Sequence, residues 1–172
     1  MLRRLTAGRW LMPILAELAR DRSARFGVLV RRLGISRSML AASLDKLEHE
    51  GWIAQNPGHG HPLRPEYLLT GGGRLAARRS LAILSSLEAE KLHAADLGRW
   101  GLPTAAALAG GCERFGDLAT ALAPVTPRAL AMALDQLTAR GLVARRSEPA
   151  RHPRYALTAL GDRLAEGLKS NL

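Results

Sequence analysis

Apolar residues recur at helical spacing in three successive stretches near the start of the chain. They predict helices over 10–20, 25–33 and 36–49. The third helix repeats leucine at intervals of four and three residues, so its three leucines share one buried face. The second helix stops near Gly34, and Gly51 follows the third helix and can supply the left-handed conformation that ends it.

Two short apolar runs follow the third helix, at 52–54 and 67–69, and they predict two strands. The segment between them is rich in proline, glycine, histidine and arginine, a composition typical of a hairpin tip. Three helices followed by a hairpin are the order of a winged helix. The helices over 25–33 and 36–49 then form a helix-turn-helix, in which the latter is the recognition helix.

The whole pattern occurs twice, at an offset of about ninety residues, so one unit has been duplicated. The matches keep their order and spacing, with only small gaps. They pair Gly8-Arg9-Trp10 with Gly98-Arg99-Trp100, Arg25-Phe26-Gly27 with Arg114-Phe115-Gly116, Leu40, Leu44, Leu47 and Gly51 with Leu130, Leu134, Leu137 and Gly141, and Tyr67, Leu69, Thr70 and Gly73 with Tyr155, Leu157, Thr158 and Gly161.

The segment between the copies, 74–97, contains neither proline nor glycine and carries a mostly apolar stripe, which predicts one long amphipathic helix. We therefore expect a mainly α fold with small β-hairpin wings. The first winged helix-turn-helix unit spans 1–73, the connecting helix 74–97 and the second unit 98–172. A shorter counterpart of the connecting helix is expected from Asp162 to about Lys169.

The chain is strongly basic: 25 lysines and arginines against 15 acidic residues give a net charge of +10, shared by both copies. This excess favours a polyanionic partner, nucleic acid first and an anionic membrane surface second. Solubility alone is the alternative explanation.

The lone cysteine, Cys112, excludes a disulfide within the chain and a multi-cysteine metal site. No apolar stretch is long enough for a signal peptide or a membrane span. We expect a cytoplasmic, nucleoid-associated protein without cofactor, metal or membrane partner. No phosphate loop, nucleophile elbow or paired carboxylates indicate an enzyme.

The motifs of both copies resemble the HxlR family of winged-helix regulators, which is related to the MarR group. The shared features are Gly-Arg-Trp before the first helix, Arg-Phe-Gly-x-x-Leu, the leucine-rich recognition helix that ends at glycine, and the second wing strand, here Glu66-Tyr67-Leu68-Leu69-Thr70 and Arg154-Tyr155-Ala156-Leu157-Thr158. Family members are dimers of one unit per chain. The resemblance therefore implies that this chain is an intramolecular pseudo-dimer, with 74–97 in the place of the dimer helix.

Two departures from the family pattern affect the expected chemistry. Many members carry a redox-sensing cysteine ahead of the first helix, but residues 1–9 hold none. The polar trio usual in the recognition helix is replaced by Ala41-Ala42-Ser43 and Ala131-Met132-Ala133, which leaves few hydrogen-bonding groups to read bases.

Candidate DNA contacts lie at the N-termini of the recognition helices and on the wings. Helix N-termini and hydroxyls bind phosphate oxygens, arginine can reach guanine in the major groove, and basic wing tips suit the minor groove. Helix caps and solvated side chains are the alternative reading. The candidates are Ser36, Arg37, Ser38, Thr126 and Arg128 on the helices, and Arg64, Arg151, His152 and Arg154 on the wings.

Other features are weaker candidates. His59 and His61 lack a third metal ligand nearby, which argues against a metal site. Cys112 is more simply interpreted as an inert residue than as a thiol sensor. Asp45 and Asp135 fall on the outward face of the recognition helices, where they would repel phosphate.

The sequence thus predicts a transcription regulator whose two winged helices bind two half-sites of duplex DNA. Self-association through 74–97 is a further expectation. The alternative is a tandem winged-helix module that binds proteins, with weak or no specific DNA binding.

Overall fold

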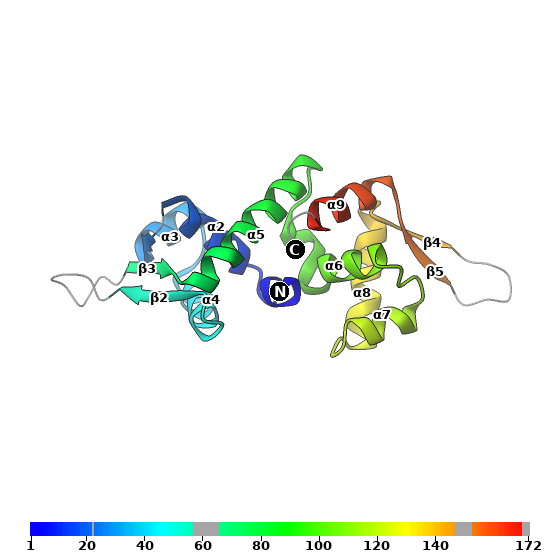
Figure 1. Ribbon diagram of the computed structural model, residues 1–172, viewed down its shortest axis with the longest axis horizontal. Coiled ribbons are helices and arrows are strands. Elements are labelled where there is room, and N and C mark those ends of the chain that lie inside the picture. Colours follow the sequence, from blue (N-terminus) through cyan, green and yellow to red (C-terminus); the bar gives the residue numbers. More distant parts are fainter. Residues whose placement is uncertain (22, 57–65, 147–152, 170–172) are drawn as a thin grey trace. The chain divides into compact units, whose positions relative to one another are not determined.

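The fold is mainly helical with small antiparallel hairpins, as predicted (Figure 1). The computed structural model describes residues 1–21, 23–56, 66–146 and 153–169. The chain divides into two compact units, of which unit 1 comprises Met1 and Trp10–Leu84, and unit 2 comprises Leu2–Arg9 and Ser85–Leu172.

Unit 1 contains the three predicted helices and a sheet. Its elements are α2 (Leu11–Asp21), β1 (Ser23–Arg25), α3 (Phe26–Leu33), α4 (Arg37–His49), β2 (Ile53–Asn56), β3 (Glu66–Leu69) and most of α5 (Gly71–Ala89). β3 lies between β1 and β2 and is antiparallel to both. Buried leucines of α4 pack with α2 and α3 to form the core, which confirms the predicted helix-turn-helix. The strand β1 was not predicted.

Unit 2 repeats this order with a two-stranded sheet. Its elements are α1 (Leu2–Leu5), α6 (Ala94–Ala109), α7 (Phe115–Ala121), α8 (Pro127–Ala139), β4 (Val143–Arg146), β5 (Arg154–Leu157) and α9 (Ala159–Lys169). The contact between α6 and α8 forms the centre of its core. Tyr155 donates its backbone N–H to the carbonyl of Glu113 at 2.8 Å, and a bridge pairs Arg114 with Arg154, where unit 1 has the strand β1.

The recognition helices α4 and α8 begin and end as predicted. Ser36 and Thr126 are the N-caps, and their hydroxyls accept backbone N–H groups at 3.3 and 3.2 Å. Gly51 and Gly141 follow the helices with φ of 70° and 68°. The next residue in each copy donates its N–H to a leucine carbonyl at 2.9 Å, which completes a Schellman cap.

A threonine joins each recognition helix to the wing and to the helix that follows the wing. The hydroxyl of Thr70 donates to the carbonyl of Gly51 at 2.7 Å and accepts the N–H of Gly73 at 3.0 Å. Thr158 makes the same two contacts in unit 2. A Cβ on Gly73 would lie 1.7 Å from the Trp52 carbonyl oxygen, so this close approach requires glycine. The repeated Thr-x-x-Gly motif therefore fixes the wing against the recognition helix.

The prediction of one helix over 74–97 is wrong. α5 ends at Ala89 and α6 begins at Ala94. Lys91 adopts a left-handed conformation (φ 56°), and Leu92 donates its N–H to the Leu87 carbonyl at 2.8 Å in a further Schellman cap. Burial of Leu87 and Leu92 stabilises this turn, although no glycine or proline in the sequence indicates a break there.

The stretch ahead of the first copy differs most from expectation. Residues 2–9 were assigned to a first unit over 1–73, but they belong to unit 2. The helix α1, which was not predicted, contacts α6, and the Arg3 guanidinium donates a hydrogen bond to the carbonyl of Ala123. Unit 2 is thus built from two separate pieces of chain, with unit 1 inserted between them.

Candidate nucleic-acid interface

The N-terminus of α4 presents three of the predicted contact residues to solvent. Arg37 and Ser38 are exposed beside the cap residue Ser36, whose Oγ lies 3.3 Å from the Oγ of Ser38. Among the described residues, no ion pair engages Arg37. Free backbone N–H groups and an exposed guanidinium at one helix end form a surface suited to an anion.

The N-terminus of α8 offers the same chemistry at a different register. Pro127 occupies the position of Arg37, so the arginine appears one residue later, as Arg128 in place of Ser38. Arg128 is exposed and forms no ion pair within the described part of the chain. The two helix ends therefore both carry one positive side chain, but not at equivalent positions.

Beyond these termini, the outward faces of α4 and α8 are unusually apolar. Ala41 and Ala42 are exposed, and Met39 and Met132 expose 48 % and 53 % of their surface. Sequence reasoning noted the alanines but missed the methionines as surface residues. The sequence could have predicted that these methionines are exposed, because both fall outside the repeating pattern of buried leucines.

Acidic residues also lie on these faces. Asp45 and Asp135 are exposed on α4 and α8, as the sequence predicted. On the neighbouring strand, burial raises the pKa of Tyr67, and the negative charges of Glu48 and Asp45 act in the same direction. The second and third turns of α4 are thus less positive than its N-terminus.

The predicted wing residues fall into two groups. Arg64, Arg151 and His152 lie outside the described residues. Arg154 begins β5, where its guanidinium pairs with the Glu113 carboxylate at 3.1 Å. This ion pair places Arg154 at the base of the wing, on the side facing the turn before α7.

The base of the second wing carries two further arginines that sequence reasoning missed. Arg145 and Arg146 are exposed on β4, and Arg146 lies directly opposite Arg154 in the strand register. The equivalent positions in the first wing are Gln55, Asn56 and Glu66, with Asn56 opposite Glu66. The two hairpins therefore have the same register but opposite electrostatic character. The Arg-Arg pair was visible in the sequence at the end of the predicted strand.

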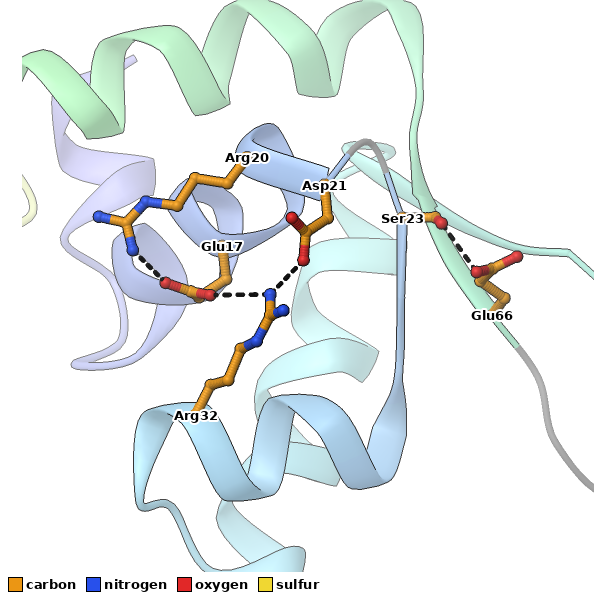
Figure 2. Close-up of polar contacts among 6 residues, drawn as sticks. All are labelled: Glu17, Arg20, Asp21, Ser23, Arg32 and Glu66. Atoms are coloured by element: carbon orange, nitrogen blue, oxygen red, sulfur yellow. Dashed lines mark hydrogen bonds and ion pairs between the residues drawn. The ribbon is translucent and has the colours of Figure 1, made fainter.

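In unit 1 the positive charge lies instead on the helix before the recognition helix. Arg25 is exposed at the N-cap of α3, and Arg31 is exposed in its second turn. Arg32 is engaged by the end of α2: it hydrogen-bonds Asp21 and lies 3.5 Å from Glu17, which also pairs with Arg20 at 2.6 Å (Figure 2).

The hydrogen bond from Arg32 to Asp21 raises the pKa of the Arg32 guanidinium above its ordinary value. Figure 2 also shows the Ser23 hydroxyl donating to Glu66 at 2.8 Å, which ties β1 to the start of β3. The Arg32 contacts hold α3 against α2, and the Ser23 contact holds β1 against β3. Arg31 is exposed beside Arg32 in the second turn of α3.

Metal and thiol chemistry gain no support from the described part of the chain. In residues 1–21, 23–56, 66–146 and 153–169 no group of three metal-ligating side chains occurs, and His59 and His61 lie outside these ranges. Cys112 is half-buried in the turn after α6, where its N–H donates to the Ala107 carbonyl at 3.1 Å. None of the described helices has the length and apolarity needed to cross a membrane.

Comparison with known proteins identifies the origin of both units. The HxlR-like helix-turn-helix family matches the chain twice, over residues 5–93 and 97–170. The chain is also 38 % identical over 71 residues to the uncharacterized HTH-type transcriptional regulator YdzF of Bacillus subtilis (strain 168). That alignment covers 41 % of this chain and 65 % of the relative. No solved structure matches the chain. With both of its halves matched in this way, the chain belongs to the HxlR-like helix-turn-helix family.

Proposed function

We propose that this protein is a DNA-binding transcription regulator, not an enzyme, and that its two winged helices contact two half-sites of one duplex. The observation that carries the proposal is the pair of recognition helices, each capped in the same way and each with an exposed arginine at its N-terminus. The net charge of +10 and the kinship to a transcriptional regulator support it.

The predicted contact residues divide by role in this proposal. Arg37 and Arg128 reach base edges or phosphates from the helix ends, and the hydroxyls of Ser36, Ser38 and Thr126 lie beside the phosphate path. The wings contribute Arg64, Arg151, His152 and Arg154 to the flanking backbone, together with Arg145 and Arg146. A nucleoid-associated location in the cytoplasm follows from such binding.

The decisive experiment selects bound duplexes from a random pool with the full chain, then maps the bound site by footprinting. A monomer covering two half-sites about one helical turn apart supports the proposal. Because the helix ends differ, the site should be an imperfect palindrome. A protected region of only one half-site per chain would show that the two units do not act together on one duplex.

A second candidate function is a module that binds another protein. The exposed Met39 and Met132, with the alanines beside them, favour it, since apolar helix faces are typical of protein interfaces. Gel shifts with random duplex at low and moderate salt separate the two: a protein-binding module shows no salt-sensitive shift.

We also propose self-association through the helix α5, on which Leu75 exposes 39 % of its surface. Light scattering over a concentration series tests it, and a constant monomer mass would rule it out. This proposal stands apart from DNA binding, which requires no second chain.

A further inference from the structure

The exposed methionines of the two recognition helices occupy related but shifted positions. Measured from the N-caps Ser36 and Thr126, Met39 is the third residue of its helix and Met132 the sixth. The equivalent residues are exchanged: Ala129 corresponds to Met39, and Ala42 corresponds to Met132. Each helix thus presents one methionine and one alanine on the same flank, in opposite order.

Packing within the fold does not account for the position of these two exposed methionines. Met1, Met39, Leu75 and Met132 are the large apolar residues that the described chain exposes most, and two of these four lie on recognition helices. Neither of them contributes to the leucine face that packs into the core. Covering an exposed apolar side chain with a partner removes its surface from water and so contributes favourably to the free energy of binding.

The surroundings of each methionine indicate which partner that is. The flank begins at a helix N-terminus beside Arg37 in α4 and Arg128 in α8, so a polyanion is favoured there. In the major groove of DNA, the C5-methyl of thymine is the apolar group on the base edges. An unbranched thioether can follow the groove surface and cover that methyl.

We propose, on the basis of the DNA-binding function above, that Met39 and Met132 read thymine methyl groups in the two half-sites. Because methionine and alanine exchange places between the two helices, the contacted thymine should lie at a different position in each half-site. Three residues of helix span about 4.5 Å, against about 3.4 Å for one base-pair step. The thymine contacted by Met132 therefore lies about one base pair further along its half-site than the thymine contacted by Met39.

The test uses the full chain and a duplex selected from a random pool. Each thymine is replaced singly by deoxyuridine, which removes only the methyl group. We expect affinity to fall about three- to five-fold at one thymine in each half-site, the effect of losing one buried methyl group, and to stay unchanged elsewhere. This scan needs no protein variant, so it stands even if a substitution prevents folding.

Protein variants then assign each position. Met39→Ser should abolish the uracil effect in one half-site and leave the other intact. The double substitution Met39→Ala with Ala42→Met should move the sensitive thymine by about one base pair. Leu75→Ser is the matched control, because it removes an exposed apolar side chain from α5 and should leave the uracil scan unchanged.

The outcomes separate this inference from the function on which it rests. Methyl readout is overturned if the chain binds a specific duplex in which no thymine is sensitive to uracil replacement, or in which no thymine is selected at these positions. Either result leaves the proposed regulator function standing. Absence of any duplex binding overturns the proposed function itself. Uracil sensitivity that persists in Met39→Ser and Met132→Ser variants shows that other residues contact the methyl groups, and this also overturns the assignment.

Discussion

At the scale of single residues, the two copies expose different side chains on the surfaces that we propose to contact DNA. Arg37 and Arg128 differ by one position in the helix, and Arg145 and Arg146 replace Gln55 and Asn56. Both copies keep the three buried leucines of the recognition helix, as preservation of the fold alone would require. Differences at these exposed positions are consistent with two unequal half-sites.

The arginines should divide into two classes when their charge is reversed. Arg37→Glu and Arg128→Glu should weaken binding to the selected site by about 1–3 kcal/mol and relax specificity at one position each. Arg145→Glu and Arg146→Glu should weaken all duplexes about equally and lower the salt slope. Affinities for the selected site and for random duplex, at two salt concentrations, provide the test. Wild-type binding by every variant would place the DNA surface elsewhere.

The glycine of the Thr-x-x-Gly motif should be irreplaceable for stability. Gly73→Ala or Gly161→Ala drives a Cβ into a backbone carbonyl, and overpacking of this kind costs roughly 1–3 kcal/mol or more. Gly27→Ala and Gly116→Ala are matched controls in the same units, since a Cβ there meets no atom within 4 Å. Those controls should be neutral or stabilising by about 0.4–1 kcal/mol. Equal denaturation midpoints for both pairs would refute the steric explanation.

A buried hydroxyl offers a stabilising substitution. Thr104 is fully buried in α6, and its Oγ1 has no hydrogen-bond partner in the described chain. The first copy places Ile14 at this position. Thr104→Val keeps the shape and removes the unsatisfied group, which should raise the free energy of unfolding by about 1–3 kcal/mol. Thr6→Val should do the reverse, because the Thr6 hydroxyl donates to the Leu2 carbonyl at 3.2 Å. A less stable Thr104→Val variant would mean that the hydroxyl has a partner.

At the scale of elements, the sequence predicted the repeated parts well and the unique parts poorly. Both recognition helices, their hydroxyl caps and glycine ends, and all four wing strands were predicted, because each signal could be checked against its copy. The break at Lys91 was not, since a lysine in the left-handed conformation carries no local signal. The strand β1 and the helix α1 are short, and they are stabilised by pairing and packing with distant residues.

The candidate interface was likewise predictable only in part. Helix-terminal residues were predictable because capping chemistry is local. The exposed methionines and the arginine pair on β4 required knowledge of which helix flank and which strand end face solvent. Glu113 as the partner of Arg154 was also beyond sequence reasoning, because 41 residues separate the two.

One ion pair should make the stability of unit 2 depend on pH. Arg163 on α9 donates two hydrogen bonds of 2.9 Å to the Glu90 carboxylate, and this contact lowers the pKa of Glu90. A carboxyl with a lowered folded-state pKa stabilises the fold above its unfolded pKa of about 4.3. That stabilisation is lost as the pH falls through the lower, folded-state pKa.

Glu90→Gln should therefore reduce the thermal midpoint at neutral pH and leave it nearly unchanged at strongly acidic pH. Glu88→Gln, an exposed change two residues away, should have little effect at either pH. Thermal unfolding of both variants across the acidic range provides the measurement. Parallel pH profiles for Glu90→Gln and the wild type would show that the pair contributes nothing.

At the scale of the whole molecule, the positive charge determines how binding responds to salt. Neutralised phosphates release counterions, so log K falls by about 0.9 per contact for each tenfold rise in salt. With about four to eight contacts, a four-fold rise in salt should weaken binding by roughly a hundred-fold or more. Titrations of labelled duplex at several salt concentrations measure this slope. An affinity that stays flat over that range is incompatible with electrostatic binding of duplex.

The insertion of unit 1 between two pieces of unit 2 has a consequence for synthesis on the ribosome. The α1 segment is translated before unit 1, yet the helix α6 that it contacts follows about ninety residues later. At roughly 5–20 residues per second, that delay lasts several seconds, during which the residues of unit 1 are translated. Leu2 and Leu5, buried in the finished protein, stay exposed until then. Residues translated ahead of unit 1 thus reach their native contacts only after unit 1 has been translated.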